Sequence, residues 1–279
     1  MEQLRQRIVG GLRAARLLNA VDRTLYAVDL LRHFRDNRAI REEYPELPFP
    51  PYPLMFDAFG NCSRRGYHDG GVAAARFIAT TIRRFMPGDL TVCEWGCGPA
   101  RTLQHIRTVD AGFTRVIGTD YNPDTIAWCR KVFPQMEFAV NGMSPPLPLP
   151  DSSVDVLYAI SVFTHLSKQR QLEWIGEIGR VLKPGGMLFF TVHGERCVSK
   201  LLPVERVQFD RGELVVRAGV REGKKHFVTY ESERFVREGL LASFAHIEPI
   251  DWPNLGQDAW VARAPVQNTG ASEVHAQQL

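Results

Sequence analysis

The sequence has few cysteines, no long apolar run and no large excess of one charge. Its five cysteines among 279 residues include no C-x-x-C pair, so neither a disulfide framework nor a zinc site is expected, and no metal is assigned. No apolar stretch is long enough to cross a bilayer, and no secretory leader is recognised. The 34 basic residues barely exceed the 31 acidic ones, which gives no overall attraction to nucleic acid. We therefore expect a cytoplasmic protein.

The most informative segment is a glycine turn that follows a short apolar run. Residues 92–101 read V-C-E-W-G-C-G-P-A-R, with Gly96 and Gly98 one residue apart and Glu94 two residues ahead of them. Glycines at this spacing let the backbone bend sharply and approach a ligand closely. A dinucleotide-phosphate loop would carry a third glycine where Arg101 stands, and Glu94 would repel a phosphate. A ligand with a cationic end therefore fits this turn better.

A second acid lies further along the chain, at the end of another β-prone run. The run spans residues 114–120 and ends at Asp120. In a doubly wound fold an acid about 20 residues past the glycine turn binds the hydroxyl pair of a ribose. More than one class of adenosine-binding fold uses this arrangement. Asp120 therefore indicates an adenosine ligand without selecting the cofactor.

Three further motifs follow in order: L-P-L-P-D at 147–151, F-T-H-L at 163–166 and R-V-L-K-P-G-G at 180–186. Together with the glycine turn and Asp120, they resemble the pattern of class I S-adenosylmethionine-dependent methyltransferases over roughly residues 90–195. A nicotinamide oxidoreductase is the alternative. That alternative leaves Glu94, the missing third glycine and the K-P-G-G turn without explanation.

The order of elements predicts the fold class. Strand-like and helix-like segments alternate from residue 91 onwards, which is typical of a parallel α/β sheet. The resemblance implies a doubly wound, Rossmann-like sheet of seven strands in the order 3-2-1-4-5-7-6, with helices on both faces. We divide the chain into an N-terminal helical or lid extension with a proline-rich connector (1–60), the methyltransferase domain (61–265) with a small β-hairpin insertion (197–229), and a disordered tail (266–279).

The sequence also predicts the secondary structure of the connector, of the helix after it and of the insertion. The five prolines of residues 44–55 predict an extended connector rather than a helix. Gly70 and Gly71 are expected to open the helix that follows, which should reach about Met86. Within the insertion, three β-prone runs are expected to be strands: 206–209, 214–217 and 227–230.

The first 41 residues are rich in arginine. They hold nine arginines, four acids and no lysine. A basic amphipathic helix can bind a membrane surface or an anionic partner. We favour a solvated face on a helix that packs as a lid or dimer element, with no integral membrane association. A homodimer is left open.

The resemblance assigns the donor site by position. Glu94 is expected to hold the methionine ammonium, and Asp120 the ribose hydroxyls. No acid follows the third strand, where the family often carries one near the adenine amine, so backbone groups and Asn141 are expected there. The complete set expected to bind S-adenosyl-L-methionine is Glu94, Gly96, Cys97, Gly98, Asp120, Tyr121, Asn141, Gly142, Met143 and Ser161.

Two histidines are candidates for catalysis. Methyl transfer is an in-line displacement at an electrophilic sulfonium, so the enzyme mainly aligns the partners and removes a proton from a hydroxyl acceptor. His193 follows the fifth strand and His165 follows the fourth, and a histidine near neutral pKa suits a base. For each of them a structural role is the alternative, and His193 is our first choice as the base.

The class of the methyl acceptor is inferred mainly from motifs that the sequence lacks. The sequence has no C-P-P-C and no N/D-P-P-Y nucleobase motif, so nucleic acid is disfavoured and a small molecule is expected. The resemblance is nearest to bacterial enzymes that modify sugars or secondary metabolites, and implies O-methylation. A protein that binds S-adenosylmethionine without turnover is the alternative from another functional class.

Overall fold

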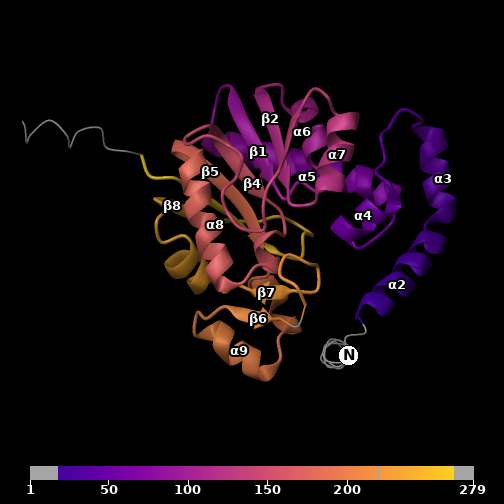
Figure 1. Ribbon diagram of the computed structural model, residues 1–279. Helices are drawn as coiled ribbons and strands as arrows, with labels where there is room; N and C mark the ends of the chain where they lie inside the picture. Colours follow the sequence, from indigo (N-terminus) through magenta and orange to yellow (C-terminus); the bar gives the residue numbers. More distant parts are fainter. Residues whose placement is uncertain (1–17, 219, 267–279) are drawn as a thin grey trace, which may run out of the picture.

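A computed structural model describes residues 18–218 and 220–266 (Figure 1). One sheet of seven strands runs through the molecule in the order β3-β2-β1-β4-β5-β9-β8. This confirms the predicted doubly wound topology, with β9 and β8 as the seventh and sixth strands of that sheet. The strands are β1 (Leu90–Trp95), β2 (Phe113–Asp120), β3 (Glu137–Val140), β4 (Val154–Ala159), β5 (Leu182–Val192), β8 (His246–Ile250) and β9 (Asp258–Arg263).

The central strand of the sheet is β1, which pairs in parallel with β2 on one side and β4 on the other. Only β9 is antiparallel to its neighbours β5 and β8. Parallel strands are covered on both faces and so need apolar residues at successive positions. Val92 and Cys93 of β1 accordingly point to opposite faces and are both fully buried.

Helices cover both faces of the sheet. α8 packs on one face, where Trp174, Ile175 and Ile178 enter the core, and α5, α6 and α7 pack on the other. The helices are α2 (Leu18–Arg32), α3 (Phe34–Glu43), α4 (Tyr52–Phe59), α5 (Arg64–Phe85), α6 (Leu103–Val109), α7 (Pro123–Val132), α8 (Lys168–Val181) and α9 (Pro203–Asp210), with shorter turns η1 (Phe163–His165), η2 (Glu195–Lys200) and η3 (Phe235–Leu240).

The proline-rich connector is not extended throughout, and this expectation was wrong for its last residues. α4 begins at Tyr52, and Pro53 lies in its first turn. A proline costs no hydrogen bond there, because the first N–H groups of a helix have no partner within it.

The following helix begins at Arg64 rather than at Gly70, because Ser63 caps it: the Ser63 Oγ accepts the Gly66 N–H at 2.9 Å. Gly71 serves packing, since a Cβ there would lie 2.2 Å from the Arg101 carbonyl oxygen.

The insertion contains a helix that the β-prone pattern missed. Residues 206–209 belong to α9, so the expected strand there was wrong. Pro203 opens this helix, and the Glu205 carboxylate accepts the Leu202 N–H at 2.7 Å. The other two runs form β6 (Val215–Arg217) and β7 (Val228–Tyr230), which pair antiparallel apart from the main sheet.

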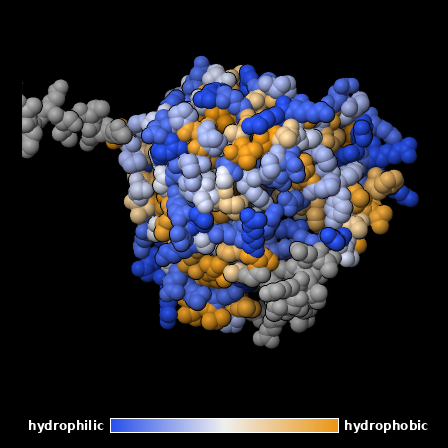
Figure 2. All heavy atoms as spheres, viewed as in Figure 1, coloured by the Kyte–Doolittle hydropathy of each residue, from blue (hydrophilic) through white to orange (hydrophobic). Residues whose placement is uncertain are grey.

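Parts of two expectations lie outside the described residues: positions 1–17 of the arginine-rich segment and positions 267–279 of the tail. Across residues 18–218 and 220–266, no helix has the length and apolarity to cross a membrane. The face shown in Figure 2 carries hydrophilic residues around smaller apolar areas, which is ordinary for a folded protein surface.

Candidate active site

The carboxyl ends of β1, β2, β3 and β4 open onto one cleft. A doubly wound sheet creates such a cleft where the strand order reverses, here between β1 and β4. Its volume is about 220 Å³. Of the residues expected from the sequence, the following line it: Glu94, Gly96, Cys97, Gly98, Asp120, Tyr121, Asn141, Gly142, Met143, Ser161 and His165. His193 is absent from the described residues that line it.

The glycine turn needs both of its glycines. Gly96 and Gly98 have φ of +74° and +50°, in the left-handed region that side chains disfavour. A Cβ at Gly96 would lie 2.4 Å from Val162 Cγ2, and one at Gly98 would lie 3.3 Å from the Ala58 Cβ. The turn is therefore packed between the loop after β4 and helix α4.

Asp120 is held by the backbone on both of its oxygens. Gly98 N–H donates to Oδ2 at 3.0 Å, and Asn122 N–H donates to Oδ1 at 2.8 Å. The residue is 7% exposed, and burial raises the pKa of the carboxyl group. Each carboxylate oxygen retains a further acceptor site. The geometry therefore suits a ligand that donates two neighbouring hydroxyl groups.

Glu94 is a buried acid that faces the same cleft. Its neighbour in the sheet register is Tyr158 of β4, whose hydroxyl donates to Oε2 at 3.0 Å. Burial raises the pKa of Glu94 to about 8, against the opposing effects of Tyr158 and of the Arg101 charge. A cation bound beside this carboxyl group would favour its ionised form.

Arg101 is the cleft residue whose role the sequence analysis missed. Its guanidinium lies 4.5 Å from the centre of the Phe59 ring. The Nε atom is buried without a hydrogen-bond partner among the described residues, and burial lowers the pKa of the guanidinium. A desolvated cation with an unsatisfied donor favours an anionic ligand group. The sequence feature that could have indicated this role is a basic residue three positions after Gly98.

Tyr121 and Asn141, which follow β2 and β3, line the cleft, and each makes a polar contact with another residue. The ammonium of Lys224 lies 5.3 Å from the centre of the Tyr121 ring and donates to its hydroxyl at 3.2 Å. Asn141 is 7% exposed and donates from Nδ2 to the Gly142 carbonyl at 2.7 Å. Its Oδ1 is buried without a partner among the described residues. That oxygen is an acceptor suited to a ligand amine.

The loop after β4 is shaped by a small polar cluster. Ser161 has φ of +58°, and its N–H donates to Thr191 Oγ1 at 2.8 Å. The hydroxyls of Ser161 and Thr191 both donate to Gln257 Oε1, at 2.9 and 2.7 Å. Thr191 and Gln257 were not expected from the sequence, because they come from β5 and from the segment before β9.

Both candidate histidines donate to carbonyl groups of the insertion. His165 Nδ1 lies 2.8 Å from the Phe227 oxygen, and His193 Nδ1 lies 3.0 Å from the Thr229 oxygen. Carbonyls only accept, so each Nδ1 carries the proton and each Nε2 is an acceptor. Burial lowers the pKa of both imidazoles, that of His193 to about 4. Of these two histidines, His165 lines the cleft and His193 does not. His165 therefore has both an accepting Nε2 and a place in the cleft wall.

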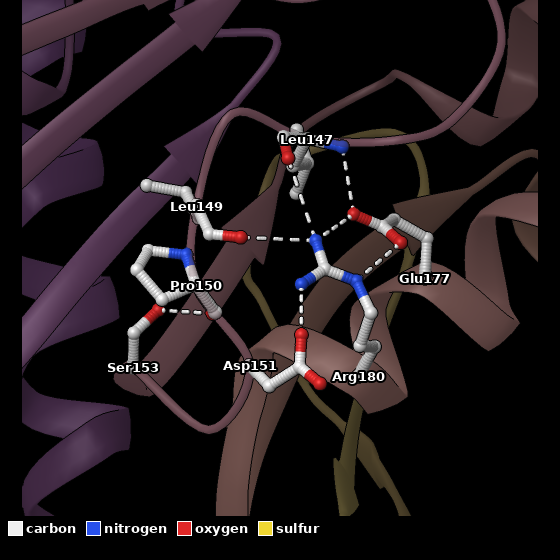
Figure 3. Close-up of polar contacts among 7 residues, drawn as sticks. All are labelled: Leu147, Leu149, Pro150, Asp151, Ser153, Glu177 and Arg180. Carbon is white, nitrogen blue, oxygen red and sulfur yellow. Dashed lines mark hydrogen bonds and ion pairs between the residues drawn. The ribbon is translucent and has the colours of Figure 1, made fainter.

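Two of the sequence motifs meet at helix α8 (Figure 3). The Arg180 guanidinium donates to the Leu149 carbonyl at 3.0 Å and to Glu177 at 2.8 Å, and it pairs with Asp151. Glu177 in turn accepts the Leu147 N–H at 2.6 Å. The L-P-L-P-D segment is thus attached to α8 through Arg180, the first residue of the R-V-L-K-P-G-G motif.

A methyltransferase domain family matches residues 93–190. A protein of Mycolicibacterium smegmatis, named a probable S-adenosylmethionine-dependent methyltransferase, is 41% identical over 96 residues, covering 34% of this chain and 35% of that protein. The sterol 24-C-methyltransferase erg-4 of Neurospora crassa is 32% identical over 167 residues, covering 54% and 42%. The matched part therefore spans less than half the length of these relatives.

Solved structures share the fold over a larger part of the chain. Streptomyces venezuelae DesVI superposes with a TM-score of 0.55 at 16% identity, covering 78% of this chain and all of that one. CalS10 of Micromonospora echinaspora, an amino pentose methyltransferase, gives 0.52 at 16%, covering 78% and 98%. The sheet order and the cleft define a doubly wound α/β protein with a cleft at its topological switch point. Residues 93–190 thus match a methyltransferase domain, on a fold shared with methyltransferases of known structure.

Proposed function

We propose that the cleft binds S-adenosylmethionine and that the protein is a methyltransferase acting on a small molecule. The observation that carries the proposal is the presence of one acidic and one basic side chain at the glycine turn. The Glu94 carboxyl group and the Arg101 guanidinium both line the cleft. They match the ammonium and the carboxylate of a methionine end, which a dinucleotide lacks.

The rest of the cleft fits the adenosine part. Asp120 has acceptor sites for the two ribose hydroxyls, and Tyr121 offers a ring for the adenine to lie along. Asn141 Oδ1, buried without a partner among the described residues, fits the adenine amine. Its amide takes the place where the family often carries an acid.

For a hydroxyl acceptor, the acceptor oxygen forms a bond to the methyl carbon while the carbon–sulfur bond breaks and its electron pair stays on sulfur. The acceptor proton must then go to a base. His165 and His193 are the proposed acceptors of that proton through Nε2. The position of His165 in the cleft wall favours His165 for the direct transfer, whereas His193 lies outside the wall.

The acceptor class is proposed as a sugar or secondary metabolite. The chain carries no nucleobase motif, and the structural relative CalS10 is an amino pentose methyltransferase. Helix α4 and the loop at 221–227 both contribute to the cleft wall, so we expect them to limit the size of the acceptor.

Calorimetry with S-adenosylmethionine, S-adenosylhomocysteine and NADH tests the donor. Binding of the first two without NADH supports the proposal, and the reverse result would revive the oxidoreductase. A screen of labelled S-adenosylmethionine against hydroxylated metabolites and nucleotide sugars, analysed by mass spectrometry, tests the reaction. Tight donor binding with no product from any acceptor would indicate a binding protein without turnover.

A further inference from the structure

The cleft is covered by two segments that are far apart in the sequence. Helix α4 contributes Leu54, Asp57, Ala58 and Phe59 to the wall, and the loop at 221–227 contributes Gly223 and Lys225. α4 lies close against the glycine turn, through the contact of Ala58 with Gly98.

The loop at 221–227 is attached to the rim of the cleft. Gly223 N–H donates to the His165 carbonyl at 3.0 Å, and Lys224 donates to Tyr121. Gly223 has φ of +81°, and a Cβ there would lie 2.1 Å from Met143 Cε. The loop therefore passes directly over residues that follow β2, β3 and β4.

Lys225 joins the two covers. Its ammonium lies 4.1 Å from the centre of the Phe56 ring of α4, a cation–π contact. The same ammonium lies 3.0 Å from Asp22 Oδ2 on α2. The loop is thus linked through one side chain to two helices of the N-terminal extension.

Asp22 also lies beside a second side chain of the same loop. His226 Nε2 lies 3.1 Å from Asp22 Oδ1, so each carboxylate oxygen faces one basic side chain of the loop. The three side chains are 24%, 27% and 28% exposed. Partial shielding makes such a cluster more effective than a fully exposed ion pair.

We propose that Asp22 is a positioning residue that latches the loop at 221–227 to the N-terminal helices and controls the exchange of ligand in the cleft. It acts through Lys225 and does not line the cleft itself. The proposal rests on the proposed function only for the identity of the ligand. The proposal assigns a role in ligand exchange to Asp22, one of the four acids of the arginine-rich segment.

Breaking the latch should free the loop to open while the donor contacts stay intact. The dissociation rate of S-adenosylhomocysteine should therefore rise about fivefold in Asp22→Asn, as expected for loss of a partly shielded ion pair. Stopped-flow fluorescence can follow it, because Trp95 and Trp174 line the cleft. Lys225→Gln should have a similar effect, because it removes the partner of Asp22.

Asp210→Asn is the matched control. Asp210 pairs with Arg206 on α9 at 2.6 Å, and neither residue lines the cleft. Dissociation should be unchanged in this variant. Unchanged dissociation in folded Asp22→Asn would overturn the latch.

Limited trypsin digestion separates this proposal from the function. The loop contains Arg221, Lys224 and Lys225, so an opened loop should be cut about fivefold faster in Asp22→Asn than in the wild type, without any ligand. If the wild type binds no S-adenosylhomocysteine, the proposed function fails, and the cleavage rate alone decides the latch. Equal cleavage of the two proteins would overturn it.

Discussion

The backbone N–H of Gly98 donates to the Asp120 carboxylate across 3.0 Å, so the turn after β1 and the acid at the end of β2 form one unit. The parallel pairing of β1 and β2 brings them together. The Asp120 carboxylate, a hydrogen-bond acceptor, therefore lies beside the backbone of a turn whose two glycines carry no side chain.

Replacing Asp120 by alanine should weaken the binding of S-adenosylhomocysteine at least tenfold. The carboxylate is expected to accept two hydroxyl hydrogen bonds, and a charge-assisted pair is worth about 1.5–3 kcal/mol. Isothermal calorimetry measures the effect, and the exposed Asp89 gives an Asp89→Ala control. Unchanged affinity in a folded Asp120→Ala protein would refute the donor assignment.

Arg101 should be selective for the amino-acid end of the ligand. Arg101→Met should lower the affinity for S-adenosylhomocysteine at least tenfold, because a charge-assisted hydrogen bond to its carboxylate is lost. Affinity for 5′-methylthioadenosine, which has no carboxylate, should change little. Calorimetry with both compounds compares them directly, and an equal loss for both would argue against this contact.

Glu94 should make stability depend on pH in the ligand-free protein. Burial raises its pKa from 4.5 to about 8, so between these values the folded protein holds a proton that the unfolded chain releases. The free energy of unfolding should therefore fall as pH rises through this window, by up to about 1.4 kcal/mol per pH unit. Urea denaturation from pH 5 to 8 should show a weaker decline for Glu94→Gln. Parallel curves for the two proteins would contradict the prediction.

Once a methyl acceptor is known, replacing His165 and replacing His193 should have different effects on the rate of methyl transfer. For a hydroxyl acceptor, removing the general base should cost about 10²–10⁴ in rate, and the loss should shrink as pH rises and the acceptor ionises unaided. We expect this of His165→Ala, with donor affinity retained. The pH–rate profile of His193→Ala is the comparison. A large, pH-dependent loss confined to His193→Ala would return the role to His193, and no loss in either variant would leave catalysis to proximity.

Local patterns predicted the elements that depend on neighbouring residues. The apolar runs and turns predicted the alternating strands and helices, because strand alternation and turn geometry are short-range properties. The strand order and the expected donor site came from the resemblance to a family. Predictions from residue type failed where the position of a residue within a helix changes its effect on secondary structure. Prolines in 44–55 indicated no helix, but Pro53 falls in the first turn of α4, where it is tolerated. The β-prone run at 206–209 became helical once Pro203 and Glu205 set its start.

The sequence by itself determined which residues carry charge near the glycine turn and which acid follows the second strand. Only the tertiary structure decided how they work together. Arg101 stands next to a turn in the chain, but burial against Phe59 is what makes it an unsatisfied cation. His165 and His193 follow two adjacent strands, and only the packing of the insertion places one of them in the cleft wall. Asp22 meets Lys225 across about 200 residues of chain, and no local pattern encodes such a contact, because long-range pairing depends on how every intervening element packs.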